Sequence, residues 1–289
     1  MKNKMKERSI LFVINPNRPD ARKVAEELCA ILEPAGFTFF ASNESGLTGA
    51  QDISSQSSAT AEVALVLGGD GTMLRGAELV REANIPLLGI NLGHVGFLAE
   101  VHKPTISEIA HAIINKSYTS ENRMLLSYSV ERNGKEVVTG WALNEVIIER
   151  NTPAMVQLLL QIDSRPVSRW GCDGVICATP TGSTAYAFSA GGPVVWPEVE
   201  AFVLLPISAH ALFSRPMVVS PDSKIIIDIE SHEAVLLGDS LRKFSLLEGD
   251  RVAITKDSRN IKLAHVNPTS FSDRLVAKFK LPVEGWRGE

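Results

Sequence analysis

The segment Leu67 to Thr72 reads Leu-Gly-Gly-Asp-Gly-Thr and joins an expected buried strand to an expected helix, the edge where open α/β sheets bind ligands. Its first two glycines should turn with positive φ and approach a ligand closely, and N–H groups after Gly71 can bind an anion. Asp70 would then be a carboxylate among peptide N–H groups, with Arg75 able to reach a phosphate. Alternatively, Asp70 is only the N-cap of a tight turn. The flanking strand, the helix and Arg75 favour a binding site.

A second segment contains many hydroxyl groups. Asp173 and Gly174 precede a short apolar strand, which leads into Thr-Pro-Thr-Gly-Ser-Thr-Ala-Tyr at 179–186 and Gly-Gly-Pro at 191–193. Such hydroxyls suit a polar, mostly neutral ligand such as a nucleoside. A turn bonded to its own backbone is the alternative and would account for three hydroxyls, whereas six beside an Asp favour a binding loop. The six are Thr179, Thr181, Ser183, Thr184, Tyr186 and Ser189.

Two smaller features each allow two interpretations. Asn144 and Glu145 interrupt the apolar run 141–148, so either they lie on an edge strand with a wet face or one is buried among binding partners. Residues 91–98 form another glycine-bearing turn after a strand, and we expect His94 to be a hydrogen-bonded loop residue without a catalytic role. The sequence has no Walker A segment, no Rossmann fingerprint and no Cys/His grouping, so we predict no metal-ligating residues.

An alternation of strand and helix patterns over residues 1–120 must position the glycine-rich turn, and it predicts an α/β domain. Continuous apolar runs indicate strands buried on both faces, and apolar residues at helical spacing indicate the helices. Thr105 and Glu108 have the spacing of a capping box. The serine-rich residues 42–60 indicate a mobile surface loop. We expect strands at 10–14, 37–40, 63–67 and 86–90, and helices at 20–33, 72–83 and 105–116.

From residue 121 the apolar pattern alternates, which predicts a β-rich, sandwich-like domain over 121–266. Asn133 and Gly134 predict a tight hairpin. The tail, 267–289, has mixed helix and strand character at 271–279. We expect strands at 125–130, 137–148, 156–162, 174–178, 224–229, 234–237 and 252–255.

Length and composition exclude several classes of protein. A chain of 289 residues suits two domains, and a net charge of -4 with ordinary glycine and proline usage argues against nucleic-acid-directed, disordered or collagen-like chains. The 6% aromatic content disfavours stacking of bases on aromatic side chains. Three cysteines without a C-x-x-C pair indicate reduced, buried thiols. With no signal sequence or membrane-spanning run, we expect a soluble cytoplasmic protein that binds neither nucleic acid nor membrane.

With these segments in this order, the sequence resembles the NAD kinase family, whose members phosphorylate the adenosine ribose 2'-hydroxyl of NAD to give NADP. The resemblance covers nearly the whole chain and rests on residues 68–72, 91–97, 144–145, 173–174 and 179–193. It implies an N-terminal α/β domain, a C-terminal β-sandwich-like domain, an active site between them and a tail that returns to the first domain. The alternative is a lipid kinase of the diacylglycerol or sphingosine type, which shares the Gly-Gly-Asp-Gly-Thr element. Lipid kinases usually also have a Gly-Thr-x-Asn-Asp segment, which residues 84–100 lack.

The resemblance implies a role for each matching residue. Asp70 would accept the proton of the attacking hydroxyl. Asp70 and Gly71 would both touch NAD, and Arg75 would lie near its phosphates. Asn144 and Glu145 would bind the ribose and nicotinamide side of NAD. The remaining implied residues are a phosphate-donor loop at Gly68, Gly69, Gly71 and Thr72, and NAD contacts at Asp173, Thr184, Ala185, Tyr186, Ala187, Phe188 and Ser189.

The resemblance also implies ATP as the phosphoryl donor, with inorganic polyphosphate as a second donor to be tested. Because the sequence lacks a Walker lysine, we expect Mg2+ or Mn2+ to arrive with ATP and carry phosphate charge, without a preformed protein cage. The family implies a homodimer or homotetramer, in which residues 151–170 could take part. Some members carry basic residues where this chain has Met155 and Gly171.

Overall fold

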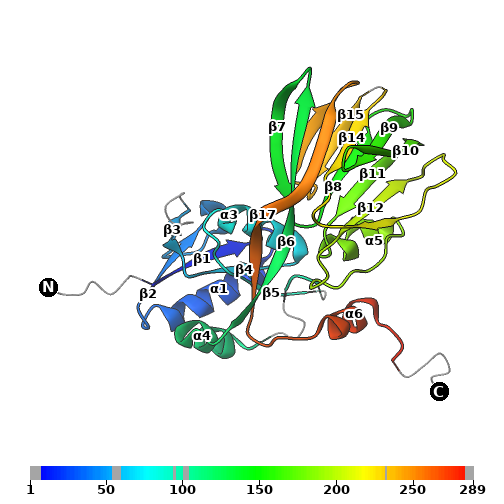
Figure 1. Ribbon diagram of the computed structural model, residues 1–289. Helices are drawn as coiled ribbons and strands as arrows, with labels where there is room; N and C mark the ends of the chain where they lie inside the picture. The colour runs from blue at the N-terminus through cyan, green and yellow to red at the C-terminus, as the bar shows by residue number, and fades with distance from the viewer. Residues whose placement is uncertain (1–7, 54–59, 94–95, 100–103, 232, 284–289) are drawn as a thin grey trace. The chain divides into compact units, whose positions relative to one another are not determined.

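The computed structural model describes residues 8–53, 60–93, 96–99, 104–231 and 233–283, and Figure 1 shows its elements. The chain divides into two compact units. Unit 1 comprises residues 1–122 and 261–289, and unit 2 comprises residues 123–260. Two long strands, β6 (Thr119–Arg132) and β17 (Arg251–His265), contain residues of both units. The predicted domain boundaries at 120/121 and 266/267 stay a prediction.

Unit 1 is built on a parallel sheet with helices on both faces. Its sheet contains β1 (Arg8–Ile14), β2 (Phe37–Ala41), β3 (Gln51–Asp52), β4 (Val63–Leu67), β5 (Leu87–Ile90) and the end of β17, and its helices are α1 (Pro19–Leu32), α3 (Asp70–Val80), α4 (Ile106–Asn115) and α6 (Phe271–Phe279). The strand order is β17–β5–β4–β1–β2–β3, and each neighbouring pair is parallel. The carboxyl ends of β4 and β5 therefore lie side by side, and the loops that follow them leave the same edge.

Alternating side chains of the strands pack under different helices. Ile10 and Phe12 of β1 share a buried cluster with residues of α1 and α4, and Figure 1 shows these two helices near β1. On the other face, Gly76 of α3 lies so close to Val66 and Leu87 that an added Cβ would be 3.0 and 2.9 Å from their methyl groups. The buried strands predicted from continuous apolar runs are thereby confirmed, since β4 and β5 are buried along their whole lengths.

Of two local sequence predictions in unit 1, the capping box is confirmed and the continuous loop is not. The capping box of α4 is present: Glu108 N–H donates to Thr105 Oγ1 at 3.2 Å, and Thr105 N–H donates to Glu108 Oε2 at 2.7 Å. Residues 42–60 are not a loop throughout their described part, because a 3-10 turn, η1 (Asn43–Ser45), and the short β3 lie within them. Ser42 Oγ stabilises that turn by accepting the Glu44 N–H.

Unit 2 consists of two β-sheets. Besides parts of β6 and β17, its strands are β7 (Lys135–Ala142), β8 (Glu145–Arg150), β9 (Val156–Ile162), β10 (Arg165–Cys172), β11 (Gly174–Ala178), β12 (Phe202–Ile207), β13 (Met217–Val219), β14 (Ile225–Ile229), β15 (Ala234–Gly238) and β16 (Arg242–Leu246). One sheet has the order β13–β12–β11–β8–β15–β16 and is antiparallel throughout. The remaining strands, β10, β9, β14, β17, β6 and β7, belong to the 11-stranded sheet that also contains the strands of unit 1. Side chains from both sheets form one buried apolar cluster, which confirms the sandwich-like prediction.

Two strand predictions in unit 2 have different outcomes. The hairpin is confirmed, since Asn133 and Gly134 have φ of 52° and 74°, as a type I' turn requires. The single strand expected at 137–148 is wrong, because β7 ends at Ala142 and β8 begins at Glu145. The interpretation of Asn144 and Glu145 as part of an edge strand is also wrong, since β8 lies between β11 and β15.

The tail forms a helix and not a strand. Ser270 caps α6 by accepting the Asp273 N–H at 3.1 Å, which explains why the mixed pattern at 271–279 folds as a helix. Within the described part of the chain, no helix is long and apolar enough to cross a membrane. The α/β region followed by an all-β region confirms the predicted fold class.

Candidate active site

The glycine-rich turn follows β4 at the carboxyl edge of the unit 1 sheet. Gly68 N–H donates to Ile90 O at 3.2 Å, so the turn starts in register with β5. An added Cβ at Gly68 would lie 2.3 Å from Thr72 Oγ1, so only glycine leaves room for that side chain. The expected positive φ is wrong, because neither Gly68 nor Gly69 has a left-handed conformation. Gly68 therefore serves close packing, not a left-handed turn.

Asp70 is the first residue of α3, and Gly69 occupies the N-cap position. The N-cap interpretation of Asp70 is therefore wrong. Its carboxylate instead reaches the segment after β5, where Oδ2 accepts the Phe97 N–H and Oδ1 accepts the Leu98 N–H, both at 3.2 Å. Gly96 makes this approach possible, because an added Cβ there would lie 2.2 Å from Asp70 Oδ1. Two glycine-bearing turns from neighbouring strands thus meet at one carboxylate.

The other predicted residues of this turn lie around the same helix start. Gly71 is exposed and has nothing within 4 Å of an added Cβ, so its backbone is open to solvent. Thr72 is buried, with its side chain against Gly68. Arg75 is exposed on α3. His94 lies outside the described residues. Among the residues that the structure describes, no three His, Cys, Asp or Glu side chains gather in a way that could hold a metal ion.

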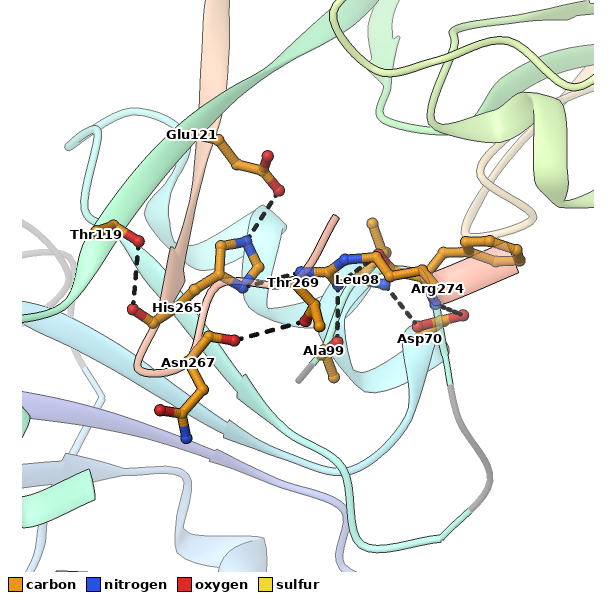
Figure 2. Close-up of polar contacts among 10 residues, drawn as sticks. Asp70, Leu98, Ala99, Thr119, Glu121, His265, Asn267, Thr269 and Arg274 are labelled. Atoms are coloured by element: carbon orange, nitrogen blue, oxygen red, sulfur yellow. Dashed lines mark hydrogen bonds and ion pairs between the residues drawn. The ribbon is translucent and has the colours of Figure 1, made fainter. Parts of the chain in front are cut away.

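Sequence reasoning missed a buried arginine behind this carboxylate (Figure 2). Arg274 of α6 is 2% exposed, and its Nη1 donates to the carbonyls of Phe97 at 3.2 Å and Ala99 at 3.0 Å. Its Nη2 contacts His265 Nδ1 at 3.2 Å. The signal was one of two basic residues, Arg274 and Lys278, in the tail helix, and it is too weak to interpret without knowing what α6 packs against.

In unit 2, the Asn144–Glu145 backbone is held from two sides. Asp239 Oδ1 accepts the Asn144 N–H at 2.7 Å, and its Oδ2 accepts the Leu143 N–H at 2.8 Å. On the other side, Thr179 N–H donates to Asn144 O at 2.8 Å. Sequence reasoning missed Asp239, although its charge in the turn after an apolar strand was visible. These bonds divert the backbone from strand pairing and so separate β7 from β8.

Glu145 is a buried acid. Its side chain is 4% exposed, and within the described structure its Oε2 has no hydrogen-bond partner. Burial, reinforced by the charge of Asp239, raises the pKa of Glu145 to about 8, although a hydrogen bond from the Tyr186 backbone opposes this shift. An unpartnered carboxyl oxygen in a buried position can bind a hydroxyl group of a ligand. This geometry favours the binding interpretation of the Asn144–Glu145 pair.

In the hydroxyl-rich segment, some hydroxyl groups bond to the backbone and others are exposed. Thr179 Oγ1 accepts the Gly182 N–H at 3.1 Å, and Ser183 Oγ donates to Pro180 O at 2.6 Å. Thr184 Oγ1 donates to Thr181 O at 3.2 Å. The self-bonded alternative thus holds for three of the six hydroxyls. The segment continues as η2 (Gly182–Thr184) and α5 (Tyr186–Ser189).

The predicted contacts at 184–189 differ in exposure. Tyr186, Phe188 and Ser189 are exposed, Thr184 and Ala185 are half-buried, and Ala187 is fully buried in an apolar cluster. Tyr186 Oη donates to Glu149 at 3.1 Å. Burial and the nearby carboxylates of Glu149, Glu145 and Asp173 raise the pKa of Tyr186. The structure therefore brings this segment together with the Glu145 region of unit 2.

Asp173 has a basic partner, and Gly171 and Met155 are the two positions at which the chain departs from the family pattern. Asp173 forms an ion pair with Arg150 Nε at 2.8 Å, so a basic partner comes from β8. An added Cβ at Gly171 would lie 2.8 Å from the Gln157 amide nitrogen, which leaves little space for a side chain there. Met155 is 39% exposed.

Comparisons with known proteins agree with these motifs. Family models described as the ATP-NAD kinase N-terminal and C-terminal domains match residues 10–118 and 143–266. An NAD kinase of Thermobifida fusca is 45% identical over 97% of this chain and 92% of its own length. An NAD kinase of Mycobacterium tuberculosis is 49% identical over 79% and 75%.

Two solved structures are similar as well. An NAD kinase from Archaeoglobus fulgidus in complex with ATP is 26% identical, with a TM-score of 0.73 over 95% of this chain and 100% of its own. A yeast NADH kinase complexed with NADH has a TM-score of 0.87 over 99% of this chain and 91% of its own; at 22% identity it shows the fold alone. Because matching domains and close relatives span most of the sequence, the chain belongs to the NAD kinase family.

Proposed function

We propose that this phosphotransferase moves a phosphoryl group from ATP to the adenosine ribose 2'-hydroxyl of NAD, giving NADP, with Asp70 as the proton acceptor. The geometry of Asp70 carries this proposal. Asp70 is the first residue of α3, and its carboxylate is held by the backbone N–H groups of Phe97 and Leu98. The next residue, Gly71, has an exposed backbone. When the phosphoryl-transfer transition state is loose, the rate depends more on the alignment of the base than on its basicity.

The start of α3 provides the phosphate-binding groups. Backbone N–H groups at a helix N-terminus favour anions, and the open backbone at Gly69 and Gly71 allows close approach. Arg75, exposed on the same helix, adds a positive charge. We assign Gly68 and Thr72 to the shape of the donor loop, because their mutual packing sets the entry into the helix.

Unit 2 provides the groups that recognise NAD. Asn144 and the unpartnered oxygen of Glu145 would bind ribose hydroxyls, and Asp173 would add a further contact. The exposed side chains of Tyr186, Phe188 and Ser189, with Thr184 and Ala185, would line the adenosine. Ala187 is fully buried, so its contribution would be to support this segment by packing.

A divalent ion, Mg2+ or Mn2+, would come bound to the ATP phosphates and supply neutralisation of their charge. The residues present fit an ion carried in this way, because the N–H groups at the start of α3 and Arg75 suit the phosphates that hold it. In this arrangement the chain orients the donor, while Asp70 receives the proton of the ribose hydroxyl.

We also propose a cytoplasmic homodimer or homotetramer, with inorganic polyphosphate as a donor to be tested. Within residues 151–170, Met155 and Val167 are 39% and 46% exposed, which suits a contact between subunits. Size-exclusion chromatography with light scattering measures the assembly directly. A monomer at micromolar concentration would reject this part of the proposal.

A donor and acceptor matrix tests the activity. ATP, GTP and polyphosphate are each combined with NAD or NADH, with and without Mg2+, and NADP(H) is measured with an NADP-specific dehydrogenase. Diacylglycerol with labelled ATP tests the lipid-kinase alternative. We expect NADP from ATP and NAD with Mg2+ and no labelled lipid; the opposite pattern would reject the proposal.

Asp70→Asn tests the mechanism. Loss of a general base costs about 100- to 10,000-fold in rate, so we expect kcat to fall by that range in a folded variant. Glu78→Gln is the matched control, because Glu78 is an exposed carboxylate of the same helix. Wild-type NADP formation by folded Asp70→Asn would refute the role of Asp70.

A further inference from the structure

The backbone segment Phe97–Ala99 of unit 1 is held from two sides. From one side, the Asp70 carboxylate accepts the N–H groups of Phe97 and Leu98 at 3.2 Å each. From the other side, the Arg274 guanidinium donates to the carbonyls of Phe97 and Ala99 at 3.2 and 3.0 Å. Figure 2 shows Asp70 and Arg274 near the labelled Leu98 and Ala99. The carboxylate and the guanidinium are thus connected through one short stretch of backbone.

Arg274 is oriented by a chain of polar groups behind it. Because a guanidinium has no acceptor, its contact with His265 requires that His265 Nδ1 be unprotonated. His265 Nε2 then carries the proton and donates to Glu121 Oε1 at 2.9 Å. A 2% exposed guanidinium needs such partners, since a buried charge without them is costly. Glu121, His265 and Arg274 therefore form one connected chain that ends at the Phe97–Ala99 carbonyls.

Helix α6 holds the same segment by its rings as well. The Phe97 ring lies 5.9 Å from the Phe271 ring and 5.7 Å from the Phe279 ring, measured between centroids. These two phenylalanines lie on either side of Arg274 in the sequence of α6. One helix therefore fixes both the side chain and the carbonyl of Phe97. Because a peptide group is planar, fixing that carbonyl also fixes the direction of the Leu98 N–H, which donates to Asp70 Oδ1.

We propose that Arg274 is a positioning residue for Asp70: it fixes the Phe97–Ala99 backbone, whose N–H groups orient the carboxylate. This inference rests on the proposed role of Asp70 as proton acceptor. Arg274 acts through the backbone and touches neither the substrate nor the reacting atoms. Its loss should therefore change the rate of phosphoryl transfer more than the binding of NAD or ATP.

Arg274→Met tests this directly, because methionine fills part of the same space without donating a hydrogen bond. A misplacement of about 1 Å can cost about 100-fold in rate, so we expect kcat to fall about 10- to 100-fold. The KM values for NAD and ATP should stay within about threefold, since uniform binding is untouched. Arg274→Lys keeps the charge but not the two-pronged geometry, and should recover part of the loss.

Arg8→Met is the matched control. Arg8 is also in unit 1, and its guanidinium donates to the carbonyls of Ile113 and Ile114 at 2.8 Å each, far from Asp70 in the sequence. Its loss should lower the midpoint of thermal unfolding while kcat of the folded enzyme stays unchanged. A similar fall in kcat for both variants would mean that loss of any arginine bonded to backbone carbonyls in unit 1 slows the enzyme. That result would overturn the proposal.

A double-mutant cycle separates positioning from general damage. If Arg274 acts through Asp70, Arg274→Met should change the residual kcat of Asp70→Asn by less than about twofold. An equal fold loss in both backgrounds would overturn the proposal. An inactive wild type, or an Asp70→Asn variant with full activity, would instead refute the proposed function and is recognised before Arg274 is varied.

Hydrogen exchange gives a second, structural readout, and it covers the case in which Arg274→Met does not fold. In Arg274→Lys the amides of Phe97 and Leu98 should exchange at least about tenfold faster than in wild type, while those of β4 keep their rates. Wild-type kcat together with wild-type exchange at these two amides in Arg274→Lys would overturn the proposal.

Discussion

Replacing Gly96 with alanine should misplace the Asp70 carboxylate. In the wild-type structure an added Cβ at Gly96 would lie 2.2 Å from Asp70 Oδ1, 2.8 Å from Cγ and 3.0 Å from Oδ2. Ordinary van der Waals contact begins near 3.4 Å. Gly96 is buried, so its backbone has little room to move. Lengthening the contact from 2.2 to 3.4 Å therefore requires Asp70 Oδ1 to retreat by about 1.2 Å.

This shift is large compared with the bonds that orient the carboxylate. The two N–H bonds from Phe97 and Leu98 are 3.2 Å long, so a further separation of about an ångström breaks both. A reacting group misplaced by about 1 Å can lose about 100-fold in rate, which corresponds to about 2.7 kcal/mol of transition-state stabilisation. We therefore expect Gly96→Ala to lower kcat about 100-fold and to leave the KM for NAD within about threefold.

The assay is steady-state NADP formation at saturating ATP, with thermal unfolding measured on the same samples. Gly93→Ala is the matched control from the same turn, because an added Cβ there meets only the end of the flexible Arg18 side chain, at 3.1 Å. It should keep kcat. A folded Gly96→Ala variant with kcat within twofold of wild type would refute the argument that this contact places Asp70.

Two further predictions concern stability. Burial raises the pKa of Glu145 to about 8, so the folded protein keeps a proton that the unfolded chain releases near the ordinary value of 4.5; stability should therefore fall as pH rises between these values, and less so in Glu145→Gln. Melting temperatures of both proteins at pH 5 and pH 8 measure this, and equal losses would contradict it. Thr105→Ala removes the cap of α4 and should cost about 1 kcal/mol in urea unfolding with kcat unchanged; a loss of kcat would contradict this separation of stability from catalysis.

Local signals predicted the elements that carry the site. The strand at 63–67 and the Thr105–Glu108 capping box depend on residues within a few positions of one another, and both formed as expected. Asn133 and Gly134 likewise specified their hairpin. The same locality explains an error: a glycine suggested positive φ at Gly68, whereas its requirement comes from the Thr72 side chain packed against it.

What holds the site residues in place lies far away in the sequence and was not predictable. Asp239 is 95 residues from Asn144, whose N–H it accepts, and this bond turns an expected continuous strand into two. Arg274 is 177 residues from Phe97. No periodicity or spacing encodes such pairs, because they arise only when separate strands and helices pack together.

The sequence by itself determined the strands and helices on either side of the glycine-rich turn, the family motifs and the carboxylate expected to do the chemistry, since these depend on neighbouring residues. Only the tertiary structure decided how that carboxylate is oriented. Asp70 meets Gly96, Phe97 and Leu98 because β4 and β5 pair in parallel and leave the sheet at one edge. Arg274 completes the arrangement because α6 packs against Phe97, and a buried guanidinium is stable only where carbonyl and imidazole acceptors converge on it.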